Sequence, residues 1–348
     1  MMKPNLVLLD LLKTACPSIQ YRLRQDLLHF STEYEEMQLL QKALLQDPLV
    51  KSVVESQTED GWFGLRFHGY DSFESGIRIL IEKGVSLEHF ALRRALDALE
   101  RDSDRIAQDL GSFGHYFDTH RLGGARMIQA SLLAQGGRFT NPLIEEQIEV
   151  ALEGMRSVLT VDSFEEATET KRNQLVYKHD IQWPGIYHLR TLAYSQNWRT
   201  PENILMVANS INRLIQFSPM PYAHVIKSSQ LIAPAAFAMI DFNPDLRTVD
   251  AIGWMMWFHR AELLCRMGIL QNNNLISHQI EHLKSLLSEN NGLFTLPLKH
   301  NYFKRWGAYT GLMLEPDWKN PVHRINDLTF RSYLILDKLQ TKEIYNDS

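Results

Sequence analysis

The segment from His115 to Arg121, His-Tyr-Phe-Asp-Thr-His-Arg, is the densest group of side chains in this chain that could transfer protons. A carboxylate beside an imidazole can fix the tautomer that general acid–base catalysis needs, so Asp118 could orient His120 or His115. The alternative is structural: Asp118 would cap the helix that follows, and the two histidines would be solvated. The residues alone leave both interpretations open.

A second group of such side chains surrounds the start of a helix predicted at Pro184. Asp180 raises the same choice between chemistry and helix capping. Tyr187 and His188 follow one turn inside the helix, and they would line a hollow if that face of the helix points inward. Together the two groups give five candidate catalytic residues: Asp118, His120, Asp180, Tyr187 and His188.

Aromatic and basic side chains elsewhere could give a ligand site its shape and polarity. Trp254 and Trp257 lie three residues apart on one helix face, where they could stack on a planar ligand or sugar or, more commonly, wedge against a neighbouring helix. Arg260 and Glu262 lie on the same apolar helix, and a buried charge needs a partner, so they would pair with each other or face a polar ligand. The candidate substrate-binding residues are Tyr116, Arg121, Trp183, His224, Trp254, Trp257, Arg260, Tyr302 and Trp306.

Helices must position these side chains, because almost every periodic stretch of the chain has helical spacing. Ile144, Ile148, Ala151 and Met155 follow the i, i+4, i+7, i+11 pattern, and sustained strand alternation is missing. We therefore expect an all-α fold.

The expected helices are of two types that alternate along the chain. Amphipathic helices with a charged face are expected at Glu35–Gln46 (continuing past Pro48), Leu87–Glu100, Asn141–Thr160, Pro201–Phe217 and Leu275–Glu289. Less polar helices, which need burial on both sides, are expected at Pro17–Leu28, Phe73–Lys83, Thr119–Ala134, Pro184–Tyr194, Ala223–Ile240, Ile252–Met267 and Asp327–Leu339. The alternation predicts a two-layer ring of inner and outer helices. Loops leading into the inner helices would gather the candidate residues at one mouth of a central hollow.

One further motif matches a metal-binding pattern. Residues 278–282 read His-Gln-Ile-Glu-His, the His-x-x-Glu-His order of inverted zinc peptidases, and histidines four apart share a helix face. Ile276, Ile280, Leu283 and Leu287 define the buried face, however, and both histidines point away from it. Downstream, only the loosely placed Glu315 offers a third ligand, so we expect no metal here and no cofactor.

The turn at residues 57–64, Gln-Thr-Glu-Asp-Gly-Trp-Phe-Gly, resembles the Gln-x-x-Asp-Gly-x-Trp repeat of the α/α toroid superfamily, which includes terpenoid cyclases and protein prenyltransferase β subunits. Residues 17–84 look like the opening of prenyltransferase/squalene-cyclase-repeat proteins, and Asn291-Gly-Leu-Phe294 looks like a decayed copy of the turn. The resemblance implies a single α/α toroid domain over residues 1–348, with a ligand cavity at its centre.

The catalytic motifs of that superfamily are missing from the chain. There is no Asp-x-Asp-Asp (residues 102–105 read Asp-Ser-Asp-Arg) and no Asp-Asp-x-x-Asp, and neither Cys16 nor Cys265 has an aspartate two residues before it. The resemblance therefore implies the fold and not the activity.

The amino-acid composition limits the classes of binding partner that we expect. A net charge of −5 over 348 residues gives no basic footprint, which argues against nucleic-acid binding. No apolar stretch is long enough for an export signal or a membrane span, so we expect a cytoplasmic protein that takes a small-molecule ligand in its hollow, with its oligomeric state open.

Three functions are compatible with these residues. The first is an enzyme that transfers protons on a small or medium organic substrate without a metal. The second is a non-catalytic binding or scaffold protein whose centre is plugged by its own aromatic side chains. The third is a carbohydrate lyase or glycoside hydrolase, the latter needing a facing carboxylate pair such as Asp118 and Asp180.

Overall fold

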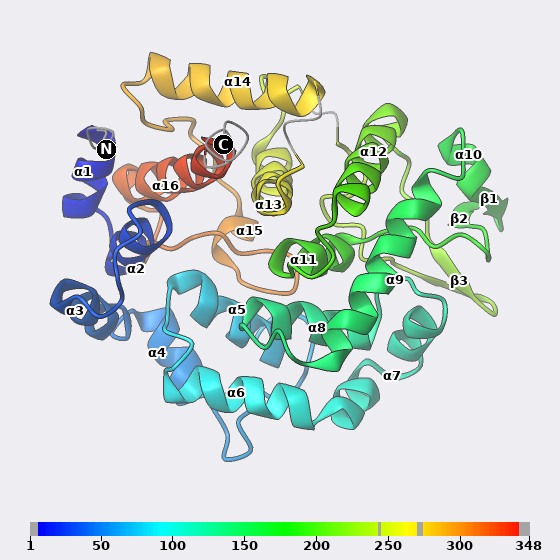
Figure 1. Cartoon of the computed structure of the whole chain (residues 1–348), viewed down its shortest axis with the longest axis horizontal. Helices are drawn as coiled ribbons and strands as arrows, with labels where there is room; N and C mark the ends of the chain where they lie inside the picture. The colour runs from blue at the N-terminus through cyan, green and yellow to red at the C-terminus, as the bar shows by residue number, and fades with distance from the viewer. Residues whose placement is uncertain (1–5, 243–244, 270–273, 341–348) are drawn as a thin grey trace. The chain divides into compact units, whose positions relative to one another are not determined.

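The computed structural model describes residues 6–242, 245–269 and 274–340. It is 58% helix and 5% strand, so the mainly helical class expected from the sequence is confirmed. Figure 1 shows these helices in chain order, with short strands only in the green part of the chain. The ring arrangement and the single domain over residues 1–348 remain predictions.

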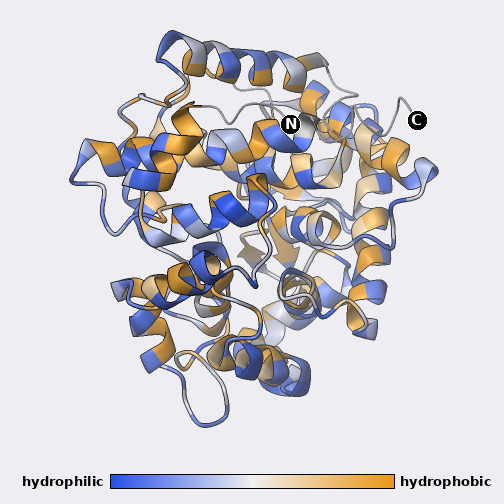
Figure 2. Cartoon of the chain, turned by 60° about the vertical axis from the view of Figure 1, so that its left-hand side comes forward, coloured by the Kyte–Doolittle hydropathy of each residue, from blue (hydrophilic) through white to orange (hydrophobic). Residues whose placement is uncertain are grey.

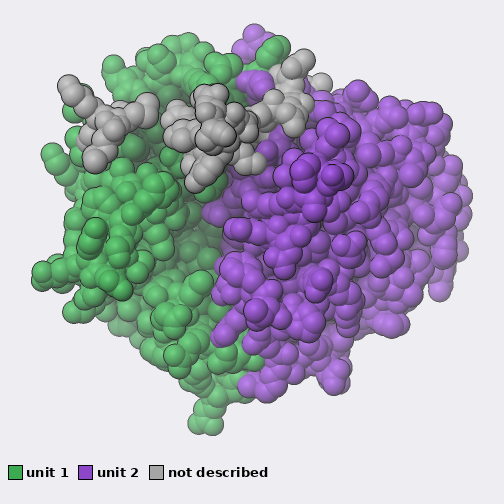
Figure 3. Space-filling view, in the orientation of Figure 1, with its two compact units in different colours: residues 1–98, 249–258, 278–348 green, residues 99–248, 259–277 purple. Residues whose placement is uncertain are grey.

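The chain divides into two compact units, which Figure 3 colours separately. Unit 1 comprises residues 1–98, 249–258 and 278–348, and unit 2 comprises residues 99–248 and 259–277. Each unit is described by itself below.

Unit 1 is built of helices. Its elements are α1 (Leu6–Thr14), α2 (Pro17–Arg22) running into the π-helical turn η1 (Leu23–Leu27), α3 (Glu35–Leu44), α4 (Pro48–Glu55), α5 (Phe73–Lys83), most of α6 (Phe90–Arg101), the first half of α13 (Ala251–Met267), most of α14 (Asn274–Glu289), α15 (Asn301–Lys304) and α16 (Pro321–Gln340). Helix α2 lies against α1, α3, α5 and α16.

Unit 2 adds two small hairpins to its helices. Its elements are the end of α6, α7 (Ser103–Thr119), α8 (Ala125–Gln135), α9 (Pro142–Val158), α10 (Phe164–Ala167), β1 (Thr168–Lys171), β2 (Gln174–Tyr177), α11 (Ile186–Tyr194), α12 (Pro201–Phe217), β3 (Val225–Lys227), β4 (Gln230–Ile232), the second half of α13 and the start of α14. Helix α8 lies against α7, α9 and α11, and α9 also contacts α11 and α12.

Local sequence signals explain several helix boundaries. Helix α12 begins at Pro201, where the missing N–H is harmless, and the Thr200 side chain accepts a hydrogen bond from the Asn203 N–H. Helix α5 ends at Gly84, whose φ of 87° is left-handed. Both helices have the bounds expected from the sequence. Figure 2 shows that many helices carry hydrophilic and hydrophobic residues side by side, as helices with one buried face require.

The turn at residues 57–64 places a tryptophan in the core of unit 1. Gly61 has a φ of 96°, and a Cβ atom there would lie 2.7 Å from the carbonyl oxygen of Arg94, so only glycine fits. Trp62 is fully buried and stacks on Phe73 with ring centroids 4.3 Å apart.

Two expected helices are wrong. Residues 223–240 form the hairpin β3–β4, in which Val225 pairs with Ile232 and Lys227 with Gln230, followed by irregular chain. Pro234 lies in the middle of this stretch and would remove a helical hydrogen bond. The helix expected at Thr119–Ala134 begins instead at Ala125, because α7 continues to Thr119 and residues 120–124 turn the chain.

The two hairpins of unit 2 join at their inner strands. Strands β1 and β2 pair antiparallel from Thr168–Tyr177 to Lys171–Gln174. A bridge between Val176 and His224 then connects β2 to the segment before β3, with the Tyr177 N–H donating to the His224 carbonyl at 2.9 Å. The hairpins therefore form one small β-structure beside the helices of unit 2.

Candidate functional site

Asp118 lies in the last turn of α7 and caps the start of α8. Its Oδ1 atom accepts a hydrogen bond from the Arg126 backbone N–H at 3.1 Å. The approach of the two helices depends on Gly124, because a Cβ atom there would lie 2.4 Å from the Gly114 carbonyl oxygen and 2.5 Å from Asp118 Oδ1. Asp118 thus satisfies a backbone N–H in the first turn of α8, but the N-cap residue of that helix is Gly124 and not Asp118, as the capping alternative had it.

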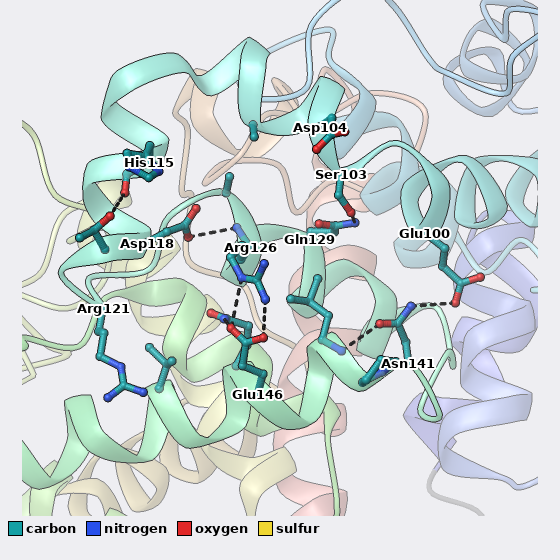
Figure 4. A pocket seen from close by; sticks show the side chains of 17 residues that line it. Glu100, Ser103, Asp104, His115, Asp118, Arg121, Arg126, Gln129, Asn141 and Glu146 are labelled. Atoms are coloured by element: carbon teal, nitrogen blue, oxygen red, sulfur yellow. Dashed lines mark hydrogen bonds and ion pairs between the residues drawn. The ribbon is translucent and has the colours of Figure 1, made fainter.

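Unit 2 contains a cleft of about 700 Å³ beside this cap. That volume is within the usual range for small-molecule sites. The cleft is walled by the end of α6 and by α7, α8 and α9, and Figure 4 shows its side chains. Its lining residues are Glu100, Ser103, Asp104, Ala107, His115, Asp118, Thr119, Arg121, Ala125, Arg126, Gln129, Asn141, Pro142, Leu143, Glu146, Gln147 and Val150.

Each of the two arginines that line the cleft forms an ion pair with a neighbouring carboxylate. The Arg126 guanidinium forms an ion pair with Glu146, and Figure 4 shows Asp118, Arg126 and Glu146 joined in a row. Arg121 Nη1 lies 2.5 Å from Glu153 Oε2. All four side chains of these pairs are at least one-third exposed, so each pair adds little stability and can rearrange around a ligand.

Neutral side chains fix the opposite end of the cleft. Gln129 Nε2 donates to the Leu99 carbonyl at 2.6 Å and lies 2.9 Å from Ser103 Oγ. Asn141 Nδ2 donates to Glu100 Oε1 at 3.2 Å, while Asn141 Oδ1 caps α9. These bonds hold amide and carboxylate groups at the wall, where they can orient a polar ligand.

The pKa of the Asp118 carboxyl is raised toward neutral pH. Partial burial raises the pKa of this carboxyl to about 6, against the lowering effects of the Arg126 N–H and guanidinium, the Ala125 N–H and His115. His115 is exposed and lies one helical turn earlier on the same wall. A carboxyl with such a pKa can both accept and return a proton near pH 6.

His120 belongs to a different cluster. Its ring stacks on Tyr116 with centroids 3.9 Å apart, and its Nδ1 atom lies 2.9 Å from the Tyr116 carbonyl oxygen. Its Nε2 atom lies 3.3 Å from Nε2 of His179, which precedes α11. The Tyr116 hydroxyl donates to the Ile226 carbonyl in β3 at 2.8 Å. The structure therefore holds His120 through Tyr116 and His179, and the orienting contact expected from Asp118 is not the one formed.

His188 and Tyr187 are buried in the interior of unit 2. The His188 ring is fully buried; its Nδ1 accepts from the Gly185 N–H at 3.0 Å and its Nε2 lies 3.4 Å from the Arg121 carbonyl. Burial lowers its pKa to about 4, so the ring is neutral and its Nε2–H faces the carbonyl. Tyr187 is 1% exposed, with the Arg190 guanidinium 5.2 Å from its ring centroid. Neither residue lines the cleft.

The remaining candidates of unit 2 have structural surroundings. Asp180 is exposed, and α11 begins at Ile186 with Gly185 as its cap, so the capping role considered for Asp180 is wrong. Trp183 is buried and stacks on Tyr177. His224 takes part in the hairpin junction through its backbone.

Arg260 is buried in unit 2 and donates to the Ala238 carbonyl at 2.8 Å. Its guanidinium also lies 4.6 Å from the Phe242 ring centroid. Burial lowers its pKa to about 10, which leaves it charged at neutral pH. Glu262 is 3.5 Å from Arg266.

Four candidates lie in unit 1, and none lines the cleft. Trp254 and Trp257 are buried edge to face with centroids 5.4 Å apart, and Trp257 Nε1 donates to Gln279 of α14 at 2.9 Å. This is the wedge that the sequence offered as the commoner alternative. Trp306 is buried, whereas Tyr302 is 38% exposed.

Sequence reasoning missed most of the cleft. Glu100, Asp104, Gln129, Asn141 and Glu146 were not considered, since three of them lie on helices expected to turn a charged face to solvent. It also missed a pair in unit 1, where His68 Nδ1 lies 2.7 Å from Oε2 of the fully buried Glu74. A glutamate at the start of the apolar stretch 73–83 was the signal for that pair.

The comparisons with known proteins give the chain no relatives: no family model matches it, and no curated protein or solved structure matches it. The toroid resemblance therefore stays an expectation. Within residues 6–242, 245–269 and 274–340, no three histidine, cysteine, aspartate or glutamate side chains gather as metal ligands. No helix among these residues combines the length and apolarity needed to cross a bilayer.

Proposed function

We propose that unit 2 binds a small polar organic molecule in the 700 Å³ cleft and that Asp118 transfers a proton to or from it. The observation that carries this proposal is the position of Asp118, a carboxyl with a pKa of about 6 at the wall of a cleft of ligand size. His115 is the second proton-active group on that wall. Tyr187 and His188 are left out because they are buried away from the cleft.

The chemistry supported best is proton abstraction or return at one position, as in an isomerisation or elimination. The Arg126 N–H holds Asp118 Oδ1 in place, so the carboxyl is oriented before a ligand arrives. The Asn141 amide, which keeps one N–H beyond its bond to Glu100, and the guanidinium of Arg126 supply donors for the ligand's own oxygen atoms. A glycoside hydrolase is supported less, because Asp180 does not line this cleft.

The test begins with binding. Ala107 lines the cleft and is exposed, so Ala107→Phe should fill part of it without disturbing a core. Ala43→Phe, at an exposed position of α3 in unit 1, is the matched control. A library of small carboxylic acids, amines, amides and polyols is screened by thermal shift and ligand-detected NMR against the wild type and both variants.

Ligands of the cleft should bind the wild type and Ala43→Phe and lose at least tenfold in affinity with Ala107→Phe. For a ligand that is turned over, or that exchanges a carbon-bound proton with D₂O, Asp118→Asn should reduce the rate at least 100-fold. If ligands bind Ala107→Phe as tightly as they bind the wild type, the cleft is not their binding site and the proposed function is wrong. If the rate of proton exchange is the same in Asp118→Asn as in the wild type, the cleft binds the ligand but Asp118 does not transfer the proton.

A further inference from the structure

The pair His120 and His179 has the geometry of two ligands of one metal ion. Two imidazole nitrogens bound to a tetrahedral zinc ion at about 2.0–2.1 Å lie roughly 3.3–3.4 Å apart. The two Nε2 atoms are 3.3 Å apart here. Two neighbouring ligands in a square-planar site, with similar bond lengths, would lie only about 2.8–3.0 Å apart. The spacing therefore fits a tetrahedral ion such as Zn²⁺ or Co²⁺.

The tautomer of His120 also suits metal binding. Its Nδ1 atom lies 2.9 Å from the Tyr116 carbonyl oxygen, which can only accept, so Nδ1 carries the proton and Nε2 presents a lone pair. Histidine ligands of metals commonly donate the other ring N–H to a carbonyl in this way, which fixes the ring orientation. The stacked Tyr116 ring adds a second restraint, since its hydroxyl is tied to Ile226 in β3.

His179 faces His120 from the loop between β2 and α11 and is exposed, so an ion can reach the pair from solvent. Without a metal, the lone pair of His120 Nε2 accepts the Nε2–H of His179. If an ion bound here, the His179 proton would move to Nδ1 of the same ring, and both Nε2 atoms would become ligands. Two water molecules would complete the tetrahedron.

We propose that His120 and His179 form a binding site for one divalent transition-metal ion of tetrahedral preference, outside the cleft of unit 2. Neither histidine lines that cleft, so the site is independent of the proton-transfer function proposed above. Bound there, the ion would link the end of α7 to the loop that follows the hairpin β1–β2. This departs from the expectation, based on sequence alone, of no metal.

Cobalt titration tests the proposal. EDTA-treated full-length protein is titrated with Co²⁺, and the visible absorption of tetrahedral Co²⁺ is recorded together with the stoichiometry by calorimetry; Zn²⁺ is then added in competition. The variants are His120→Gln and His179→Gln. The matched control is the double variant His278→Gln/His282→Gln, which removes two histidines spaced i, i+4 on α14, one of them exposed and the other half-buried.

The wild type should bind one Co²⁺ per chain with tetrahedral absorption, and Zn²⁺ should displace it. Each single variant should weaken binding at least tenfold, while the double variant keeps the wild-type affinity. Circular dichroism of the metal-free variants checks that they remain folded. Absence of tetrahedral absorption in the wild type overturns the proposal, as does its persistence in both single variants or its loss in the α14 double variant.

Discussion

The Asp118 carboxylate caps the neighbouring helix across a glycine turn, accepting the Arg126 N–H at 3.1 Å. This contact makes Asp118 both part of the α7–α8 junction and part of the cleft wall. A substitution there therefore affects stability as well as any chemistry, and the two effects must be measured separately.

Asp118 should make stability depend on pH in an unusual direction. Burial raises its pKa in the folded state from 3.8 to about 6, so the folded state binds the proton more tightly than the unfolded state does. The free energy of unfolding should therefore fall as the pH rises from about 4 to about 6, by up to about 2 kcal/mol once partial solvent exposure is allowed for. Urea unfolding curves of the wild type and Asp118→Asn, taken across this range, measure the difference. Parallel pH profiles for the two proteins would contradict this.

His188 should act in the opposite sense. Its pKa is lowered from 6.5 to about 4 by burial, so below pH 6.5 the unfolded state gains a proton that the folded state resists. The free energy of unfolding should therefore decrease as the pH falls from about 6.5 to about 4, by up to about 3 kcal/mol.

The His188→Asn variant keeps an acceptor for the Gly185 N–H and removes the titrating ring. Its baseline stability will be lower because of the lost volume, but its unfolding free energy should lack this acid-side decline relative to the wild type. The comparison uses the difference between the two pH profiles, so the contribution of Asp118 cancels. A decline of equal size in His188→Asn argues against the assignment.

The Lys83–Asp47 ion pair of unit 1 should matter far more than an exposed pair. Lys83 is 1% exposed, lies 2.9 Å from Asp47 Oδ2, and also donates to the Leu314 carbonyl. Asp47→Asn keeps the cap of α4, since asparagine is an equally good cap, but leaves the ammonium buried without its counter-charge. We expect a loss of about 3 kcal/mol in chemical denaturation.

The matched control lies in the same helix. Glu55→Gln removes the carboxylate from the exposed pair with Lys51, at 3.7 Å, and should change the free energy of unfolding by less than about 0.5 kcal/mol. Equal losses in the two variants would show that the burial of Lys83 is not the determining factor.

Gly124 should tolerate no side chain. Alanine there would bring Cβ within 2.5 Å of both the Gly114 carbonyl and the Asp118 carboxylate, so α8 would have to move away from α7. We expect Gly124→Ala to reduce the free energy of unfolding by at least about 2 kcal/mol. Thr119→Ala, on the exposed side of the same junction, should cost under about 0.5 kcal/mol. Thermal unfolding monitored by circular dichroism separates the two, and a Gly124→Ala variant as stable as Thr119→Ala would be inconsistent with this packing.

Sequence patterns predicted helices best where the boundary residues were unambiguous. The stretch at 201–217 starts with Thr-Pro, and the stretch at 73–83 starts after Ser72 and ends before Gly84, so local chemistry and hydrophobic period agree. At 223–240 the apolar residues predict a helix, but Pro234 and the β-branched residues around Val225 favour the strand and loop that the structure shows. Helix α7 was missed because Gly111 and Gly114 interrupt a polar sequence, and the structure does show a non-helical backbone at Gly111.

The site was harder to predict than the helices. Asp118 was found because a carboxylate among histidines suggests chemistry, yet its partner Arg126 comes from the next helix and Glu146 from the one after that. Which polar faces meet across a cleft depends on helix packing, and the hydrophobic period carries no such information. His188 is expected from the sequence to line a hollow if its helix face points inward, whereas the structure buries its ring against Gly123 and Gly154.

The imidazole of His188 packs against two glycines, Gly123 and Gly154, which have only a hydrogen atom as side chain. A Cβ atom at Gly123 would lie 3.0 Å from the Cε1 atom of this ring, and one at Gly154 would lie 3.0 Å from its Cδ2 atom. The residue types at positions 123, 154 and 188 should therefore depend on one another. Among descendants of this chain, alanine at position 154 should be tolerated only together with a residue smaller than histidine at position 188. Gly154→Ala combined with His188→Ala should accordingly be more stable than the sum of the two single losses allows.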